Sequence, residues 1–302
     1  MYKRLELHNH TNESDASCTC RELTELMAAD QVDAFALTDH NTISGHKKIQ
    51  AILEKTHLPI SFIPGMEYTT YYGHILCLNL KEYVPWENIN KHKPELLFLA
   101  ARAKGALVGI AHPFSYGWPF AQGCRFVMTV TDYSCCDFIE IFNNPEPLHE
   151  VNEKALLLWE SLVLSGEKLS ATCGMDLHGN SSFSGHYATY IQGEKGGDVS
   201  QELVDAIHMQ KTWICKGPLL EIQKEDGMIH FSVHQTKKAG YIPALPEDYI
   251  ITLKSGSTTL TCHPYDRIPV TEFGQDTIII PKLYEKDVVL ENLVCVSPVI
   301  HL

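Results

Sequence analysis

The sequence has no long stretch of positive charge and no long apolar stretch. No run of five or more Lys or Arg residues occurs, and the formal net charge is -13 with His neutral. Because such a surface repels long nucleic acid, we expect no duplex-binding role. No window approaches the roughly 18 uninterrupted apolar residues that suggest a membrane helix, and the first residues form a strand-like segment without an apolar signal region. We therefore expect a cytoplasmic protein without a membrane segment.

The sequence also lacks the motifs of several other chemistries. Its ten cysteines are scattered, without the paired C-x-x-C of a zinc ribbon, so we expect free thiols in a reducing compartment. We assign no catalytic role to Cys18, Cys20 or Cys173. No G-x-x-x-x-G-K motif or other glycine-rich phosphate cradle is present. Any bound phosphate would therefore be held mainly by metal ions.

The distribution of apolar residues changes along the chain. Up to about residue 180, short runs rich in β-branched residues alternate with helix-like segments, which predicts a mostly parallel sheet, open or closed into a barrel. After about residue 195, one more helix leads into strand-like runs separated by Gly, Pro and charged turns. We therefore expect two domains, 1–195 and 196–302, the second small and β-rich. Helices are expected at about 21–30, 44–55, 86–104, 148–165 and 199–210.

Five of the expected strands end in a side chain that can bind a metal. In a parallel barrel the carboxyl ends of the strands face one mouth. Side chains alternate along a strand, so His8 and His10 project to the same side. His74 would start the return strand of a hairpin that turns near Tyr72 and Gly73. The candidate metal ligands are His8, His10, Asp15, His40, Glu67, His74, His112, Asp176 and His178.

A single His or Asp at a strand end is usually a hydrogen-bonded loop residue, and the coincidence of many such positions is what favours a metal cluster. His46, His57, His92 and His149 have no such placement, so we expect them at the surface or in packing. His186 lies on a Gly- and Ser-rich loop after the last candidate ligands. It is our candidate for protonating a leaving group.

Several motifs resemble those of the polymerase and histidinol phosphatase (PHP) family of metal-dependent hydrolases. They occur in family order over residues 7–179 and are LHNHTNESDAS, ALTDHNTISG, GMEYTTYYGHILCL, IAHPF, IEIFNN and GMDLHG. The resemblance implies a distorted (β/α)7 barrel with two or three metal ions at its mouth. A looser resemblance of PGMEYTTYYGHIL, GMDLHG, KGPLLEI and VSPVIHL to the two-domain branch with carbaryl-hydrolase-like proteins implies a small antiparallel β domain after the barrel.

The same resemblance implies how the ligands are shared. His8, His10, Glu67 and Asp176 would bind one metal, and Glu67 would bridge to a second that also takes His74 and His112. Asp15, His40 and His178 would hold a third. The sequence departs from the family pattern at Met175, where many relatives have Ser.

A mixture of imidazole and carboxylate ligands suits Mn, Zn or Fe, so two or three such divalent ions are the expected cofactors. Metals that share Glu67 would lower the pKa of a bridging water towards neutrality and supply a hydroxide for attack, with Glu67 and Asp176 as catalytic residues.

Other residues near these motifs could support the candidate ligands or line the pocket. Asp39 and Asn41 are expected to orient ligating imidazoles. Glu140 and Asn143 either face the mouth or only hydrogen-bond within a loop. The aromatic residues after His112 either line one side of the pocket or pack on the barrel rim, and they are Phe114, Tyr116, Trp118 and Phe120.

The leading functional hypothesis is a metal-dependent phosphoesterase that hydrolyses a small phosphate ester, such as a nucleotide or sugar phosphate. An ester or carbamate hydrolase is the first alternative, because the same hydroxide can attack a carbonyl. The second is a non-catalytic module that its metals stabilise. The expected partner is a small phosphate-bearing substrate, with no long nucleic acid and no membrane.

Overall fold

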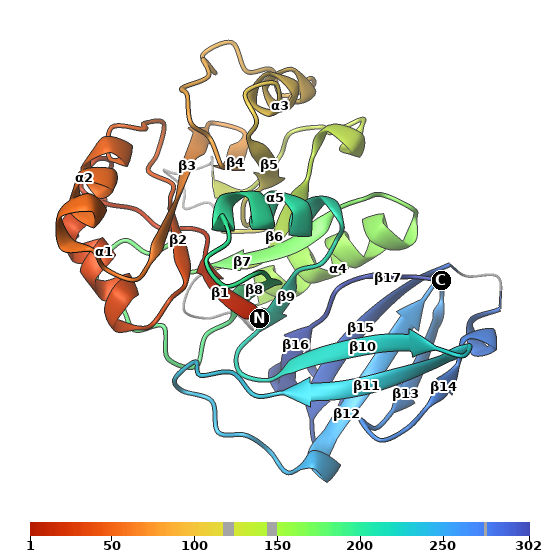
Figure 1. Ribbon diagram of the computed structural model, residues 1–302. Helices are drawn as coiled ribbons and strands as arrows, with labels where there is room; N and C mark the ends of the chain where they lie inside the picture. The colour runs from red at the N-terminus through yellow and green to blue at the C-terminus, as the bar shows by residue number, and fades with distance from the viewer. Residues whose placement is uncertain (117–123, 144–149, 275–276) are drawn as a thin grey trace.

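The structure is a computed structural model, and it describes residues 1–116, 124–143, 150–274 and 277–302 (Figure 1). Up to Gly174, strands and helices mostly alternate. The order is β1 (Tyr2–Glu6), α1 (Cys20–Ala29), β2 (Ala34–Leu37), α2 (His46–Thr56), β3 (Ser61–Thr70), β4 (Gly73–Leu78), α3 (Glu95–Arg102), β5 (Leu107–Ile110), the 3-10 turn η2 (Tyr133–Cys135), β6 (Phe138–Asn143), α4 (Glu150–Leu164) and β7 (Ser170–Gly174).

Strands β1 to β7 lie side by side in chain order. The pairs β1–β2, β2–β3, β5–β6 and β6–β7 are parallel, whereas β4 is antiparallel to both β3 and β5. The expected hairpin near Tyr72 and Gly73 is confirmed, since Thr70 pairs with Gly73. Just beyond β1 and β7, Asn9 bridges to Leu177, and the N–H of His10 donates to the Leu177 carbonyl at 2.9 Å. The two edges of this set of strands therefore meet at their carboxyl ends.

The rest of the chain is mostly antiparallel strands (Figure 1). The large sheet continues from β1 through β8 and β9 to β16, β15, β12 and β13, while β10, β11 and β14 form a separate three-stranded sheet. The fold is therefore a mixed α/β fold with one large sheet and few helices. These elements are β8 (Ala188–Gln192), α5 (Val199–His208), β9 (Trp213–Cys215), β10 (Leu219–Glu225), β11 (Met228–His234), η3 (Pro246–Asp248), β12 (Tyr249–Ser255), β13 (Thr258–Cys262), β14 (Ile268–Pro269), η4 (Val270–Phe273), β15 (Ile278–Glu285), η5 (Leu290–Asn292), β16 (Leu293–Val296) and β17 (Ile300–His301).

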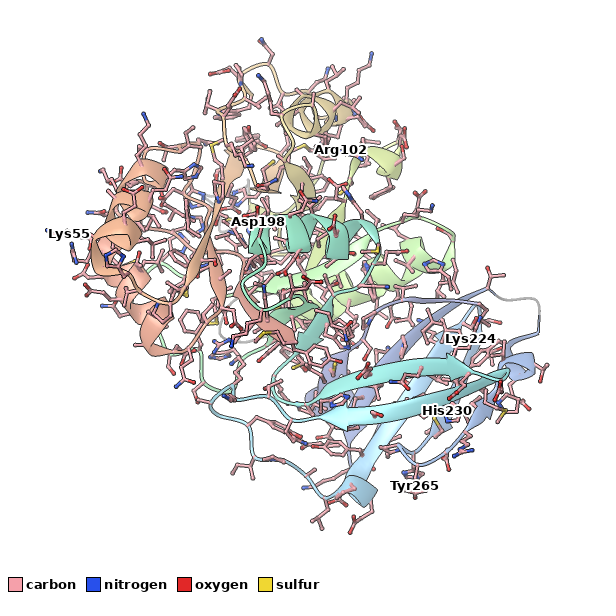
Figure 2. The ribbon with its side chains drawn as sticks, viewed as in Figure 1. Lys55, Arg102, Asp198, Lys224, His230 and Tyr265 are labelled. Carbon is pink, nitrogen blue, oxygen red and sulfur yellow. The ribbon has the colours of Figure 1, made fainter. Side chains whose placement is uncertain are left out.

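Four of the five expected helices lie within about two residues of their predicted bounds. The fifth was predicted over 86–104, and this was wrong at its start, because α3 begins at Glu95. Proline has no N–H to donate and fits only at the first turn of a helix, so the helix starts after Pro94. Helices α1 and α5 have side-chain N-caps. Before α5, for example, the Asp198 carboxylate accepts the N–H of Ser200 at 3.0 Å (Figure 2).

Helix α4 connects the first strands to the later ones through a buried ion triad. Glu160 is fully buried, and its carboxylate lies 2.6 Å from Lys254 Nζ on β12 and 2.5 Å from Lys282 Nζ on β15. On the same helix, Trp159 Nε1 donates to the Leu169 carbonyl at 2.9 Å. Two residues of one helix turn therefore tie the loop before β7 to the C-terminal strands.

No helix in the described ranges is long and apolar enough to cross a membrane. All ten cysteines are free, and nine of them are buried.

Candidate metal centre

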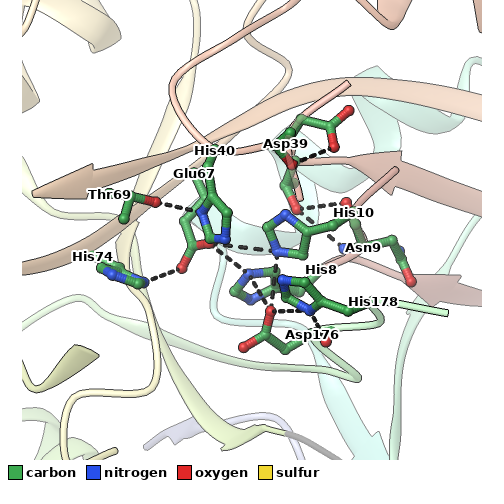
Figure 3. Close-up of polar contacts among 12 residues, drawn as sticks. His8, Asn9, His10, Asp39, His40, Glu67, Thr69, His74, Asp176 and His178 are labelled. Atoms are coloured by element: carbon green, nitrogen blue, oxygen red, sulfur yellow. Dashed lines mark hydrogen bonds and ion pairs between the residues drawn. The ribbon is translucent and has the colours of Figure 1, made fainter. Parts of the chain in front are cut away.

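The structure brings the nine candidate ligands together in three overlapping groups. Figure 3 labels seven of them, which are His8, His10, His40, Glu67, His74, Asp176 and His178. Within each group, the ligand atoms all lie within 4.8 Å of one another. The first group is His8, His10, Glu67 and Asp176, the second is Glu67, His74 and His112, and the third is His10, Asp15, His40 and His178. The one difference from the expected sharing is His10, which lies within reach of the third group as well as the first.

The extended segment that continues β1 presents His8 and His10 on one side and Asn9 on the other. The Asn9 side-chain amide donates to the carbonyls of Glu6 and Ala36, both at 3.0 Å. Its backbone N–H donates to the Thr38 hydroxyl at 3.0 Å. These bonds fasten the β1 extension to β2, so both imidazoles are held in the mouth by strand alternation.

Glu67 is the central carboxylate of the cluster. Its Oε1 lies 2.8 Å from His74 Nδ1 and 3.0 Å from His112 Nε2. Its Oε2 lies 2.9 Å from His40 Nδ1, 3.3 Å from His8 Nε2 and 3.4 Å from His10 Nε2. Burial alone would raise the pKa of Glu67, but the charges of His8 and His74 and the hydrogen bonds from His112 and His40 hold that pKa well below its usual value. The side chain is therefore a carboxylate, the form that binds metals.

Two candidate ligands have a backbone conformation that non-glycine residues rarely adopt. Asp176 has φ 49° and His112 has φ 26°. Near Asp176 the packing is also tight, because a Cβ on Gly174 would lie 2.3 Å from the Cβ of His8. Gly174 thus lets β7 approach β1 closely enough for Asp176 Oδ1 to lie 3.0 Å from His10 Nε2. Such strain is typically kept where a site requires it.

Several inner atoms of the cluster make no hydrogen bond of good geometry within the described part of the chain, although imidazole nitrogens and carboxylate oxygens face one another there at 2.9 to 3.5 Å. These buried atoms are His8 Nε2, both ring nitrogens of His10, Glu67 Oε2, His112 Nδ1 and Asp176 Oδ1. Buried polar atoms without partners are costly and rare, so a convergent set of them indicates a missing ligand. Imidazole nitrogens and carboxylate oxygens are the donors that borderline divalent ions prefer. The residues present therefore fit divalent metal ions.

The imidazoles of the cluster differ in the direction of their pKa shifts, and burial lowers the pKa of His10. Burial lowers the pKa of His112, but the hydrogen bond and charge of Glu67 outweigh it and raise that pKa to about 9. The pKa of His8 is likewise raised well above its usual value, because Glu140 and Glu67 outweigh the effect of burial.

Glu140, on β6, orients two candidate ligands. Its Oε1 lies 2.9 Å from His8 Nδ1, and its Oε2 accepts the backbone N–H of His112 at 3.0 Å. The side-chain amide of Asn143 donates to the same Oε2 at 3.0 Å. Of the two interpretations of Glu140 and Asn143, the structure supports the one in which both face the mouth. The Glu140 carboxylate leaves Nε2 as the free donor atom of His8.

The expectation that Asp39 and Asn41 contact ligating imidazoles was wrong. Asp39 accepts the N–H and hydroxyl of Thr11, at 2.7 and 2.8 Å, and the Ser14 hydroxyl at 2.8 Å. Asn41 instead pairs with the backbone of Thr69 in both directions at 3.0 Å. Both residues follow the end of β2, and their side chains are bonded to Thr11 and Ser14 in the first loop and to the backbone of β3, not to an imidazole.

The contact from His40 Nδ1 goes instead to the hydroxyl of Thr69 (Figure 3). We did not identify Thr69 from the sequence. It lies two residues after Glu67 on the same strand, so strand alternation would have placed it on the same side.

The remaining candidates lie outside the cluster or cannot be placed. No contact in the described part of the chain joins His186 to the nine ligands, and burial and the charge of Lys238 lower its pKa. Phe114 is half-buried, and the exposed Tyr116 contacts Glu150 through its hydroxyl. Trp118 and Phe120 lie outside the described residues.

Comparison with known proteins agrees with the site. Two curated relatives, the 5'-3' exoribonuclease Rnm of Escherichia coli and that of Salmonella typhimurium, are each 30% identical over 79 residues. This match covers 25% of the chain and 27% of either relative, so the chain spans about a quarter of their length.

A solved structure from Bacteroides vulgatus, of a two-domain protein containing a predicted PHP-like metal-dependent phosphoesterase, has a similar fold. Its TM-score is 0.57 at 16% sequence identity, and the match covers 99% of this chain and 95% of the other. The family model of the PHP domain matches residues 6–116, which include seven of the nine candidate ligands, Glu67 among them. The first part of this chain is therefore similar to a PHP domain over residues 6–116.

Proposed function

We propose that the protein is a metal-dependent phosphoesterase that hydrolyses a small phosphate ester, such as a nucleotide or sugar phosphate. The observation on which this rests is the set of buried, unpartnered nitrogen and oxygen atoms that converge around Glu67. Two or three divalent ions, of Mn, Zn or Fe, would bind there and would supply Lewis acidity and a water of lowered pKa. The PHP domain supports this assignment.

In this proposal each ligand has a role that its position supports. His8, His10, Glu67 and Asp176 hold one metal, Glu67 with His74 and His112 holds a second, and Asp15, His40 and His178 hold a third. Glu67 and Asp176 are the catalytic carboxylates, because each lies within 3.5 Å of two or more imidazoles. The Glu140 carboxylate fixes the His8 ring, so that Nε2 is directed towards Glu67.

His186 remains the candidate for protonating the leaving group, on the support of its position in the loop after Asp176 and His178. If it has this role, His186→Ala should lower kcat for an alkyl phosphate, whose leaving group needs a proton, more than for p-nitrophenyl phosphate. Equal kcat values for wild type and variant on both substrates would show that His186 does not protonate the leaving group.

We infer a matching architecture. Strands β1 to β7 would form the distorted (β/α)7 barrel, as their order and the meeting of Asn9 with Leu177 support. Residues 196–302 would form the small antiparallel β domain. The similar fold of the two-domain Bacteroides vulgatus protein supports this division.

The second candidate substrate is the 5' end of an RNA strand, which the names of the two curated relatives favour. The net charge of -13 disfavours binding of a long RNA strand, because contacts to many phosphates need Lys and Arg side chains. A short oligonucleotide that enters the mouth by its end fits both observations.

The test is a substrate comparison with the metal-loaded protein. It uses p-nitrophenyl phosphate, its diester, AMP, a short 5'-phosphorylated RNA and an aryl carbamate. We expect phosphate ester hydrolysis, and its loss by at least about 100-fold in Glu67→Gln, because one carboxylate serves two metal groups. Glu54→Gln, at an exposed position on α2, is the matched control. Preference for the carbamate, or no turnover of any substrate, would contradict the proposal.

A further inference from the structure

The mouth of the strand bundle has very few positive side chains. The loops that follow β1, β2, β3, β5, β6 and β7 in the sequence are residues 7–19, 38–45, 71–72, 111–137, 144–149 and 175–187, and the structure describes all of these residues except 117–123 and 144–149. In the sequence of these six loops, Arg125 is the single Lys or Arg. The chain has 24 such residues in all. Of those outside the loops, Lys238 also reaches one of them, where its Nζ donates to the Phe183 carbonyl.

Arg125 belongs to a short segment that the structure fastens beside the cluster. The N–H of Phe126 donates to the carbonyl of Pro113 at 3.1 Å, directly after the candidate ligand His112. The N–H of Val127 donates to the carbonyl of Tyr72 at 2.8 Å, in the hairpin turn before His74. Two backbone bonds therefore hold Arg125 between the strands that present His112 and His74.

The glycine of the hairpin makes this position possible. Gly73 has φ 123°, and a Cβ there would lie 2.5 Å from the Cα of Phe126. Any larger residue would push the segment away from the turn, so the backbone of Phe126 rests directly on Gly73.

The neighbour on the other side also lies near the metal ligands. Burial raises the pKa of the Cys124 thiol, and the charges of Asp176 and Glu67 raise it further. Cys124 is thus close enough to both carboxylates to feel their charge. The segment reaches the hairpin at Val127, with Arg125 between Cys124 and the two bonded residues Phe126 and Val127.

The guanidinium of Arg125 is available to a ligand. The residue is exposed, and no hydrogen bond or ion pair to it occurs within the described part of the chain. By contrast, Lys48, on α2 beside the mouth, is already paired with Glu13. A guanidinium binds two oxygens of a phosphate at once and carries a full positive charge.

We propose that Arg125 binds the non-bridging oxygens of the substrate phosphate and so selects anionic esters over neutral ones. This inference rests on the proposed function and adds a positioning residue to it. The cluster alone would accept a carbonyl or a phosphoryl group, whereas the Arg125 cation favours the substrate that bears negative charge at the reacting group. Metal loading itself does not require Arg125, because the residue is not among the nine candidate ligands.

The experiment measures binding of inorganic phosphate to the metal-loaded full chain by calorimetry, with metal content determined in parallel. We expect the Kd for phosphate to rise about ten-fold in Arg125→Ala, less in Arg125→Lys, and not at all in Arg267→Ala, an exposed arginine after β13. Metal content should stay that of the wild type. An unchanged Kd in Arg125→Ala, or no phosphate binding by the wild type, would overturn the inference.

Kinetics separates this inference from the proposed function. If the wild type hydrolyses p-nitrophenyl phosphate, Arg125→Ala should raise KM for that ester while KM for a neutral nitrophenyl ester stays constant. If no phosphate ester is hydrolysed but phosphate affinity still depends on Arg125, the proposed function fails and the phosphate site stands. If turnover occurs and KM for both esters is unaffected by Arg125→Ala, the phosphate site fails and the proposed function stands.

Discussion

His8 Nδ1 lies 2.9 Å from Glu140 Oε1, although the two residues are 132 positions apart in the chain. Both side chains are almost fully buried, and the same carboxylate accepts the N–H of His112 through its second oxygen. One residue of β6 therefore sets the ring orientation of one candidate ligand and the backbone position of another.

The substitution Glu140→Gln should lower metal affinity about 10- to 100-fold while the fold is kept, because the amide retains the shape but not the charge that orients His8. Competition with a chromogenic chelator measures the affinity. Glu54→Gln is the control. Equal metal affinities in the two variants would show that Glu140 does not orient the metal ligands.

The substitution Asp15→Asn should remove metal from the third group alone. Asp15 is exposed, and its Oδ1 lies 3.3 Å from His178 Nε2 and 3.5 Å from His40 Nε2, whereas the first two groups do not include it. We expect about one metal ion fewer per chain by elemental analysis. His92→Ala, at an exposed position before α3, is the control for a lost surface side chain. Complete loss of metal in Asp15→Asn would show that the three groups bind as one unit.

Metal binding should release protons and should tighten as the pH rises. The pKa of His112 is raised to about 9 in the metal-free protein, so its imidazole is mostly protonated at pH 7, while a metal binds only the neutral ring. Below about pH 9 a metal must displace the proton of His112 before it can bind that ring. Metal affinity therefore increases as the pH rises towards about 9. Calorimetry in two buffers of different ionisation enthalpy measures the released protons. Identical heats in both buffers would refute the prediction.

The substitution Lys282→Ala should cost about 3 kcal/mol of unfolding free energy, because it leaves the fully buried Glu160 with one partner fewer. Lys254→Ala should cost less, since the Lys254 side chain is more exposed and Glu160 keeps Lys282. Urea unfolding measures both. Lys224→Ala, on the outer face of β10 (Figure 2), is the control. A cost below about 0.5 kcal/mol for Lys282→Ala would show that the triad is as weak as a surface pair.

The correct and incorrect sequence predictions have a common physical explanation. The ligand types at the strand ends were predictable because strand alternation and the strand-end position are local properties, as His8 and His10 show. The start of α3 was mispredicted because the apolar pattern before Pro94 continues where the backbone cannot be helical. The partners of Asp39 and Asn41 were mispredicted because Thr11 in the first loop and Thr69 on β3 occupy their side chains instead of an imidazole.

The sequence by itself determined which side chains could bind metal and in which order the strands present them, because both follow from short-range periodicity. Only the tertiary structure decided that Glu67 lies within reach of five imidazoles, that Glu140 orients His8, and that Arg125 lies beside the hairpin before His74. These contacts join residues from different strands. Their distances depend on how the strands pair and how closely Gly73 and Gly174 let the backbone approach, which no local pattern encodes.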